Sequence, residues 1–582
     1  MADIINKARI RQRAVVITLL DLKNAFGEVH HNLIQSVLDY HHIPEHIKFV
    51  IKSLYTEFQT SIITSEFRTP FISVGRGVLQ GDCLSPLLFN MCFNTFIQHI
   101  KAEKYRQFGF SFKLLNHIHW FQFADDAAVI TGQESENQHL LNRFSIWCQW
   151  SNMIIRVDKC STFGIKKAIT KSVQYLPKLI ISNNLIPTVK IGEAFQYLGR
   201  YFDFNMSSDN HKTELTTLVN ELMTDIDSKP LHPRNELLVY SRYVLSKISW
   251  HFTIAILSKT WVIENIDPVV NQYIRKWLEI PIPGTLSTVF LTRNKSGQSI
   301  YPPSVKFIQC QTVLLKALKL SPNQSINELW KSTNTHTNIQ YDFYNSTKEV
   351  LKDFRSEHED KLQNQLTCQG SFFSSITKSS LSHLSKVWST AQSKLPQNIY
   401  NLNIRYINNS LPSRKNFSRW GLSSSSECSF CLGPGSLLQV VTGCQCYLDR
   451  FTWRHNSILN FLANTLQSVN GSALYAEVPG FKSPSIITGD TYRLNLLLSL
   501  SNGSLYVVEL TVGYETNLEN NVNRKKAKYK ELVKQLDKNF NEVSFINLSM
   551  SSLGIFAQEC STFLEMLGNV GLDKNYQTYV LC

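Results

Sequence analysis

The sequence predicts an α+β fold for the N-terminal part of the chain, because two apolar strands end in carboxylates and helical patterns follow them. The run of residues 15–20, Val-Val-Ile-Thr-Leu-Leu, is predicted to be a strand and is followed directly by Asp21. Asp125 and Asp126 come at the tip of a predicted strand-turn-strand. Strands that carry carboxylates and are backed by helices indicate an α+β architecture. The helical spacing lies at Val29, Leu33, Val37 and Leu38, and at Leu140, Leu141, Phe144, Trp147 and Cys148.

The three carboxylates predict a magnesium site. An unpaired buried anion is costly, whereas clustered carboxylates are tolerated when divalent cations lie between them, and oxygen ligands suit Mg²⁺. Two such ions can stabilise the attacking and leaving oxygens of a phosphoryl transfer. A single Asp after an apolar strand is usually a turn former or a helix N-cap. The prediction of nucleotidyl transfer therefore depends on a third element between the strands.

That third element is a glycine-rich loop that leads into a helix, over residues 75–90. Glycines at 75, 77 and 81 permit close backbone approach and unusual dihedral angles. Ser85 and Pro86 predict a helix start, with Ser85 as the cap and Pro86 in the first turn. Such a loop suits a template base or an incoming nucleotide, although its residues alone indicate only a phosphate-binding candidate.

Five motifs, in the family's order, resemble the reverse-transcriptase domain of non-LTR (LINE-type) retrotransposons. They are residues 20–26 (LDLKNAF), 80–86 (QGDCLSP), 123–126 (FADD), 156–160 (RVDKC) and 195–199 (FQYLG). The resemblance implies a polymerase palm in which Asp21 and Asp125 hold two Mg²⁺ ions and Asp126 supports them. It also implies that Phe26 is the bulky gate that rejects a ribose 2′-hydroxyl.

The same resemblance implies roles for the remaining motif residues. Gln80, Gly81, Ser85 and Pro86 would contact the nucleotide and the template. Lys159 would assist the pyrophosphate leaving group. The primer grip would be formed by Tyr197, Leu198 and Gly199.

Composition agrees with a nucleic-acid enzyme. The net charge of +14 and the pI of about 9.1 favour polyanionic partners. The chain has no run of eighteen apolar residues and no secretory pattern, and its 12 cysteines, spread over 582 residues, argue against a secreted disulfide scaffold. We expect an intracellular protein with no membrane partner. The resemblance implies a nuclear location, although no clear targeting signal is present.

The length of 582 residues accommodates several domains. We expect a palm with primer grip at 1–205, a helical thumb at 206–300, a helical linker at 301–420, a zinc-knuckle-like segment at 421–465 and an α/β restriction-endonuclease-like domain at 466–582. Twenty residues precede Asp21, where related polymerases carry a fingers region. Arg9, Arg11 and Arg13 look like the last helix of that region. We therefore expect a truncated chain with weak or absent polymerase activity.

A second constellation is Cys428-x-x-Cys431, followed by Cys444, Cys446 and His455. A CxxC pair places two thiolates on one tight turn, as a tetrahedral Zn²⁺ site requires. The same family has a Cys-Cys-His-Cys knuckle, and its His position falls at Gln439, a poor zinc ligand. The prediction is a zinc site of Cys428, Cys431 and Cys444, with Cys446 or His455 as the alternative fourth ligands.

Near the C-terminus, two strand-like segments are joined through Asn502-Gly503, which predicts a hairpin, and a charged helix follows over residues 523–536. This unit resembles the restriction-like endonuclease of site-specific non-LTR elements. Glu509 matches the second metal-binding acid, and Lys525 and Lys528 match the basic helix. Asn495 stands where the family has Asp, so an oxygen donor remains but the charge that holds the cation is lost. We expect an impaired nuclease that still binds DNA.

The function implied by the resemblance is RNA-directed DNA synthesis, ancestrally coupled to nicking of a DNA target. The partners would be an RNA template, a DNA target or primer, and deoxynucleoside triphosphates. One alternative is a non-catalytic nucleic-acid-binding remnant, favoured by Gln439 and Asn495. Another is an intron maturase-type enzyme or an RNA-dependent RNA polymerase, and Phe26 argues against the RNA polymerase if it fills the ribose gate.

Overall fold

The computed structural model describes residues 1–79, 81–102, 105, 107–112, 115–324, 326–327, 330, 344–379, 394–573, 577 and 580. These residues divide into two compact units. The first contains Met1–Leu215, Ile254–Leu257 and Leu314–Asp342. The second contains Thr216–Thr253, Ser258–Val313 and Phe343–Cys582. No helix among the described residues is both long and apolar enough to cross a membrane.

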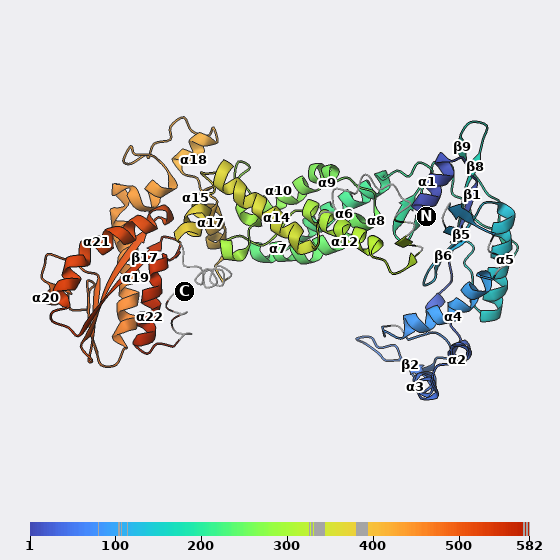
Figure 1. Ribbon diagram of the computed structural model, residues 1–582, viewed down its shortest axis with the longest axis horizontal. Helices are drawn as coiled ribbons and strands as arrows, with labels where there is room; N and C mark the ends of the chain where they lie inside the picture. The colour runs from blue at the N-terminus through green and yellow to red at the C-terminus, as the bar shows by residue number, and fades with distance from the viewer. Residues whose placement is uncertain are drawn as a thin grey trace. The chain divides into compact units, whose positions relative to one another are not determined.

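A five-stranded antiparallel sheet forms the centre of the first unit (Figure 1). Its strand order is β6 (Trp120–Phe123), β7 (Asp126–Thr131), β1 (Val15–Leu20), β8 (Ser161–Lys167) and β9 (Ser172–Tyr175). The central position of β1 explains its unbroken apolar run, because both faces of this strand are covered. Leu20 pairs with Ala127 in β7, so Asp21 comes level with Asp126 at one end of the sheet.

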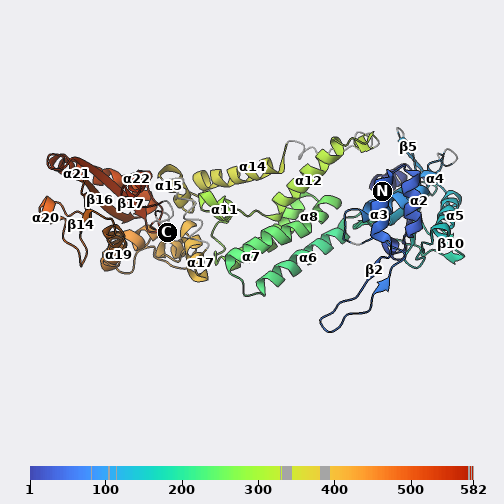
Figure 2. The same cartoon turned by 90° about the horizontal axis from the view of Figure 1, so that it is seen from below.

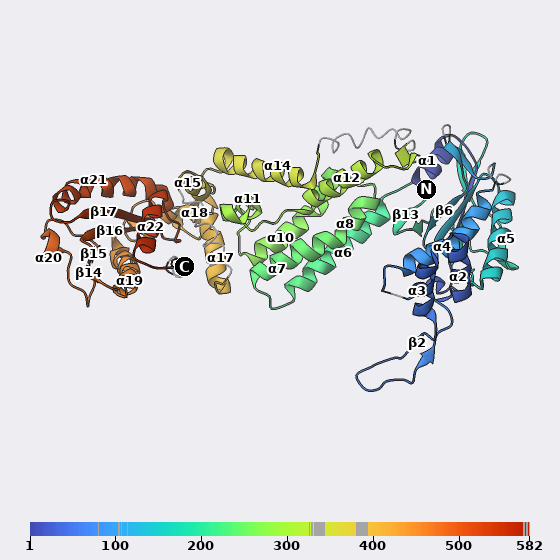
Figure 3. The ribbon, with the colours of Figure 1, turned by 60° about the horizontal axis from the view of Figure 1, so that its bottom comes forward.

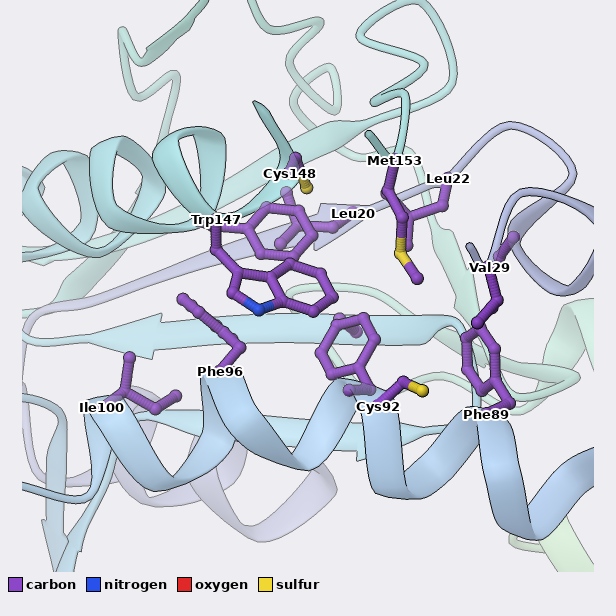
Figure 4. Close-up of a cluster of buried hydrophobic side chains, with 14 of the residues drawn as sticks. Leu20, Leu22, Val29, Phe89, Cys92, Phe96, Ile100, Trp147, Cys148 and Met153 are labelled. Carbon is purple, nitrogen blue, oxygen red and sulfur yellow. The ribbon is translucent and has the colours of Figure 1, made fainter. Parts of the chain in front are cut away.

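Helices cover both faces of this sheet. On one face lie α2 (His31–Tyr40), α4 (Ser85–Ile100) and α5 (Glu134–Ser151), whose apolar side chains pack with Val16 and Leu20 of β1. Figure 4 shows Phe96 of α4 pointing toward Trp147 of α5 in this core, while Phe89, nearer the start of α4, lies beside Val29. On the other face, α1 (Ala2–Ile10) packs against Val15 and Ile17. The predicted helices after both carboxylate motifs are confirmed.

Shorter elements complete the first unit. Figures 2 and 3 show the hairpin of β2 and β3 extending away from the palm core. The elements are η1 (Ala25–Gly27), α3 (Glu45–Tyr55), β2 (Gln59–Thr60), β3 (Ile72–Ser73), β4 (Phe110–Phe112), β5 (Leu115–Ile118), β10 (Ile180–Ile181), β11 (Asn184–Leu185), β12 (Phe195–Tyr197) and β13 (Arg200–Phe202).

The described residues between 206 and 420 are mainly helical, as expected for the thumb and linker, while the domain limits themselves stay predictions. Tyr240 is fully buried in a π-helical turn and donates to the carbonyl of Tyr301 at 2.8 Å, which joins two helical segments. The helices are α6 (Asp209–Asp227), α7 (Pro233–Val239), η3 (Tyr240–Val244), α8 (Leu245–Ile254), α9 (Lys259–Asn265), α10 (Asp267–Trp277), α11 (Ser287–Phe290), η4 (Arg293–Lys295), α12 (Pro303–Lys319), α14 (Thr347–Asp360), η6 (Lys361–Gln365), α15 (Ser371–Ser379), α17 (Gln397–Ile407) and α18 (Arg414–Arg419).

The C-terminal part of the second unit contains a four-stranded sheet in the order β14 (Ser472–Ala476), β15 (Leu496–Leu500), β16 (Ser504–Gly513) and β17 (Glu542–Ser551). The predicted hairpin is confirmed: β15 and β16 are antiparallel, and Gly503 in their turn has φ +83°. The parallel partner β17 follows a crossover through α21 (Leu518–Leu536). Figure 3 shows α21 beside this sheet.

Alternate residues of the hairpin face different helices. Leu497, Leu505 and Val507 pack against Tyr529 and Leu532 of α21. Leu496, Leu498 and Val508 belong to a second cluster with α19 (Leu448–Gln467) and α22 (Ser561–Asn569). Further short elements are η7 (Gln439–Gly443), η8 (Gln445–Tyr447), α20 (Ser485–Thr488), η9 (Glu515–Asn517) and η10 (Gln558–Cys560).

Candidate active site and metal centres

The structure brings Asp21, Asp125 and Asp126 together at one end of the palm sheet. Asp21 follows β1 directly, and Ala124, with φ +50°, makes the turn that places both other aspartates beside it. Burial raises the pKa of Asp126, and the charges of Asp125 and Asp21 raise it further. Burial also raises the pKa of Asp21, and Asp125 adds to this effect. The carboxylates therefore lie close enough to repel one another.

Basic residues partly offset this negative charge. Arg156 Nε lies 3.9 Å from Asp21 Oδ2, and the backbone N–H of Arg156 donates to the carbonyl of Asp21 at 2.9 Å. The charges of Arg156 and Lys159 both act to lower the pKa of Asp21.

The carboxylate oxygens of the aspartates at 21, 125 and 126 do not all lie within 4.8 Å of one another. Mutually repelling oxygen donors of this kind fit divalent cations, whose charge would remove the repulsion.

The glycine-rich loop lies on the first palm motif. The N–H of Val78 donates to the carbonyl of Phe26 at 2.9 Å. Gly77 has φ +91°, and a Cβ there would lie 2.9 Å from the carbonyl oxygen of Gly27, so glycine is required at this contact. Phe26 stacks on Phe89 with ring centroids 4.2 Å apart. Gly81 also has positive φ, at +102°, and Gln80 lies outside the described residues.

The predicted helix cap was wrong. Ser85 is the first residue of α4 and its hydroxyl donates to the carbonyl of Leu79, while Asp82 Oδ1 accepts the backbone N–H of Ser85 at 2.6 Å. Asp82 therefore satisfies a free amide at the helix start, a role for which aspartate is as well suited as serine. Pro86 lies in the first turn, as predicted.

The hairpin expected to be the primer grip ends beside the palm carboxylates. Leu198 and Gly199 form its turn with φ values of +50° and +74°. The hydroxyl of Tyr197 donates to the backbone carbonyl of Asp126 at 3.4 Å. Burial and the charge of Asp126 raise the pKa of Tyr197 to about 12, so this phenol stays protonated at neutral pH. The contact fixes the hairpin next to the third motif.

Two of the three N-terminal arginines contact the protein itself. Arg9 donates to the carbonyl of Asn205 at 2.7 Å. Arg13 donates to the carbonyl of Ser111 at 2.9 Å and lies over the ring of Phe110. Arg11 is exposed. Arg9 and Arg13 therefore hold α1 and its neighbouring loop to the palm.

The structure gathers the sulfur atoms of Cys428, Cys431 and Cys444 within 4.8 Å of one another. The carboxamide Nε2 of Gln439 lies 3.3 Å from Cys431 Sγ. This hydrogen bond, with a smaller contribution from the Gly433 backbone, lowers the pKa of Cys431 to about 7. Burial raises the pKa of Cys444 to about 11. Three converging sulfur donors fit a soft divalent cation such as Zn²⁺.

Neither predicted fourth ligand joins this cluster, which corrects the prediction. Cys446 Sγ is directed to the carbonyl of Phe430, 3.8 Å away. His455 lies on α19, exposed, with Nδ1 3.1 Å from Asn456 Oδ1. Cys446 lies in the short helix η8, which turns its side chain away from Cys444. His455 lies in the following helix, α19, and does not reach the cluster. Gln439 is the residue found beside the sulfur atoms instead.

The C-terminal candidate residues meet around Glu509, whose side chain is only 1% exposed. The backbone N–H of Asn495 donates to Glu509 Oε2 at 3.2 Å. The ammonium of Lys525 is paired directly with Glu509 Oε1. Lys528, which is exposed, donates to the hydroxyl of Tyr529 at 2.9 Å. All four predicted residues therefore lie in one site.

Tyr529 is a site residue that the sequence analysis did not identify. Its hydroxyl lies 3.1 Å from Glu509 Oε1, and burial together with the charge of Glu509 raises its pKa. The signal available in the sequence was its place one turn after Lys525 on the same helix face, since residues four apart are neighbours on a helix. Lys525 and Tyr529 thus enclose Glu509 from α21.

Comparison with known proteins finds a family match in the N-terminal part of the chain and relatives among retrotransposon proteins. Residues 2–199 match the family described as reverse transcriptase (RNA-dependent DNA polymerase). The Pol polyprotein of the type-2 retrotransposable element R2DM of Drosophila melanogaster is 22% identical over 326 residues, 55% of this chain and 30% of that protein. The Pol polyprotein of the type-1 element R2 of Bradysia coprophila is 21% identical over 612 aligned residues, 98% of this chain and 64% of that protein. The chain therefore spans less than two thirds of either relative.

A solved structure of apo telomerase from Candida tropicalis matches with a TM-score of 0.29 and 10% identity, over 57% of this chain and 55% of that one. A likeness at that level carries no argument about function.

Proposed function

We propose that this chain, whose residues 2–199 belong to the reverse transcriptase family and resemble that domain of R2 non-LTR retrotransposons, synthesises DNA on an RNA template. The observation that carries the proposal is the convergence of Asp21, Asp125 and Asp126 at one end of the palm sheet. The charge of Asp125 raises the pKa of both other carboxylates, and bound cations would offset this repulsion.

The palm residues have different roles in the proposed reaction, namely metal binding and stabilisation of the leaving group. Asp21 and Asp125 would hold two Mg²⁺ ions, with Asp126 as the supporting carboxylate. When bound, such ions stabilise the attacking and leaving oxygens of nucleotidyl transfer. The primer 3′-hydroxyl attacks the α-phosphate of a deoxynucleoside triphosphate, and pyrophosphate leaves. Lys159, whose charge acts on Asp21, would offset the charge on that leaving group.

Other residues of this site orient the reactants. Phe26, held by its stack on Phe89, excludes a ribose 2′-hydroxyl. The glycine-rich loop with Gly81, Ser85 and Pro86, and Gln80 by resemblance, positions the nucleotide and the template base. The hairpin turn at Leu198 and Gly199, fixed through Tyr197, positions the primer end.

Primer extension on an RNA template tests the proposal. The purified chain is supplied with a primed RNA template, labelled deoxynucleotides and Mg²⁺, and the Asp125→Asn and Asp21→Asn variants are measured beside it. Against the weak or absent activity expected from the sequence, the proposal requires Mg²⁺-dependent extension by the native chain. We expect this extension to fall by at least about a thousandfold in both variants, because each removes a charged metal ligand. Extension that persists in Asp125→Asn would refute the two-metal assignment.

For the C-terminal part of the second unit we propose a DNA-binding domain with an impaired nuclease site, adjoining a zinc-binding segment. Asn495 cannot supply the charge of the family's aspartate, and Lys525 already neutralises Glu509. Cys428, Cys431 and Cys444 would hold Zn²⁺ through their thiolates. We expect stoichiometric zinc in the purified chain, and its absence by metal analysis at neutral pH would contradict the zinc assignment.

Two departures from the family pattern, Gln439 and Asn495, favour a second candidate function, a non-catalytic nucleic-acid-binding protein. DNA or RNA binding without extension, unchanged in Asp125→Asn, would support this alternative. Extension that depends on Asp125 would exclude it. Primer extension and nucleic-acid binding, each measured for the native chain and for Asp125→Asn, therefore distinguish the two candidate functions.

A further inference from the structure

We propose that Gln439 acts as a hydrogen-bond donor to the Cys431 thiolate and not as a metal ligand, so that a metal held by Cys428, Cys431 and Cys444 keeps one coordination position open to a small ligand from solution. This inference rests on the zinc site proposed above. It concerns what closes that site, which neither the cysteine spacing nor the family comparison determines.

The orientation of the Gln439 carboxamide shows which of its two ends faces the sulfur atom. Its Nε2 lies 3.3 Å from Cys431 Sγ. A thiolate accepts hydrogen bonds and cannot donate them, so the amino end of the amide is the end that belongs beside the sulfur. The Oε1 end lies instead toward Gly443, where a Cβ would come within 2.4 Å of it. The oxygen, which is the only metal-binding atom of this side chain, is therefore turned toward Gly443.

The backbone around Gln439 stabilises this arrangement. The N–H of Gln439 donates to Ser436 Oγ at 3.2 Å, and its carbonyl accepts the N–H of Cys444 at 2.8 Å. On the amino side, a Cβ at Gly433 would lie 3.2 Å from Nε2. Glycines at 433 and 443 thus leave just enough room for the amide between them. The donor position is held by local structure and does not depend on the metal.

No other side chain among the described residues takes the fourth position. Cys428, Cys431 and Cys444 form the complete set of metal-ligand atoms within 4.8 Å of one another at this place in the described chain. Cys446 is directed to the carbonyl of Phe430, and His455 lies beside Asn456. Gln439 is only half-buried and Gly443 is exposed, so solvent reaches this side of the cluster. Protein zinc sites with three ligands and an open position bind water or a small molecule there.

The kind of ligand that suits the open position follows from the histidine that is missing at position 439. A zinc ion with three thiolates is an acceptor for one further neutral or anionic donor, and imidazole is the group that a histidine at position 439 would supply. Free imidazole is therefore a suitable probe of the open position. The Gln439→His variant is the matched control, because its own side chain would fill the position.

The experiment uses the full chain, with a phosphine reductant in place of a thiol, loaded with Co²⁺ as a spectroscopic substitute for Zn²⁺. Imidazole is titrated while the visible ligand-field bands are recorded for the native chain, Gln439→Ala and Gln439→His. We expect the bands of the native chain and of Gln439→Ala to shift with imidazole, and those of Gln439→His to stay constant. We also expect Gln439→His to bind Co²⁺ at least about tenfold more tightly than the native chain, since it adds a ligand.

Three outcomes would overturn the inference. A native chain that ignores imidazole while Gln439→Ala responds would identify Gln439 as a ligand. A native chain that ignores imidazole until Cys446→Ser or His455→Gln is introduced would identify one of those residues as the closing ligand. Failure of the Co²⁺-loaded native chain to show sulfur-to-cobalt charge-transfer bands would overturn the zinc proposal itself, and this inference with it.

Discussion

Asn495 is connected to Glu509 across the β15–β16 hairpin by one hydrogen bond, and a second joins it to the neighbouring Leu510; neither bond requires a charge at position 495. The backbone N–H of Asn495 donates to Glu509 Oε2 at 3.2 Å, and Asn495 Oδ1 accepts the N–H of Leu510 at 2.8 Å. An aspartate at 495 would accept the same N–H. The local fold is therefore compatible with either residue, whereas divalent-cation binding is not.

The first prediction is that Asn495→Asp restores metal-dependent DNA cleavage. The substitution adds the second carboxylate beside Glu509 while it keeps the hydrogen bond from Leu510, so the site regains two anionic oxygen ligands. We expect nicking of supercoiled plasmid by the Asn495→Asp chain with Mg²⁺ or Mn²⁺, and none by the native chain. The double variant Asn495→Asp with Glu509→Gln controls for contaminating nuclease. Nicking by the native chain would contradict the impaired site.

The second prediction concerns the ion pair of Lys525 with Glu509. Because Glu509 is buried, removing the ammonium leaves a poorly compensated charge in the core, which costs about 3 kcal/mol. Lys525→Met should therefore lower the Tm of the transition that reports on the C-terminal sheet, measured by calorimetry. Lys530→Met, an exposed position on the same helix, should change stability by less than about 0.5 kcal/mol.

A second substitution tests whether the uncompensated charge of Glu509 causes the loss of stability in Lys525→Met. Adding Glu509→Gln to Lys525→Met removes the uncompensated carboxylate and should recover part of the loss. If Lys525→Met is as stable as the native chain, Glu509 is compensated by its neighbours Asn495 and Tyr529 alone.

Much of the palm could be predicted from the sequence because its signals are local. A continuous apolar run indicates a strand covered on both faces, and carboxylates directly after such strands come together wherever the strands are neighbours in a sheet. Asp21 and Asp126 meet for this reason, since Leu20 pairs with Ala127. The helices behind them were visible as apolar spacing.

The residues that were missed or misassigned depend on packing between distant segments. Tyr529 reaches Glu509 only because α21 crosses the sheet at that point, and helix spacing does not give the crossing position. Cys446 follows Cys444 by two residues, yet the helical turn at η8 directs it away from the cluster. Asp82 and Ser85 were equally good cap residues by type, and the loop geometry selects Asp82.

The third prediction tests the ribose gate. Phe26 is held rigidly against Phe89, so its ring has a fixed position beside the glycine-rich loop. Phe26→Ala should reduce the preference for deoxynucleotides over ribonucleotides in primer extension by at least about tenfold, because it removes the steric block. Phe26→Tyr keeps the ring and should preserve the preference. Unchanged discrimination in Phe26→Ala would place the gate elsewhere.

The fourth prediction is a pH dependence of stability in the second unit, caused by Glu515. Glu515 is only 1% exposed, and its Oε2 accepts from the hydroxyl of Tyr406 at 3.3 Å. Burial raises its pKa from the ordinary 4.5 to about 7, against the opposing effect of the hydrogen bonds it accepts. A carboxyl with a raised pKa in the folded state is favoured in its protonated form. Its contribution to stability is therefore complete below pH 4.5 and is lost as the pH rises to 7.

The loss between pH 4.5 and pH 7 amounts to about 3 kcal/mol, from the size of the pKa change. Urea unfolding of the full chain, followed through a probe in the second unit at pH 5 and at pH 8, measures it. Glu515→Gln cannot ionise, so its pH 5 to pH 8 difference should be smaller than that of the native chain by about 2.5 kcal/mol, the part of the loss that falls between these two pH values. Equal pH differences in the two proteins would show that Glu515 is already ionised without penalty in the folded state.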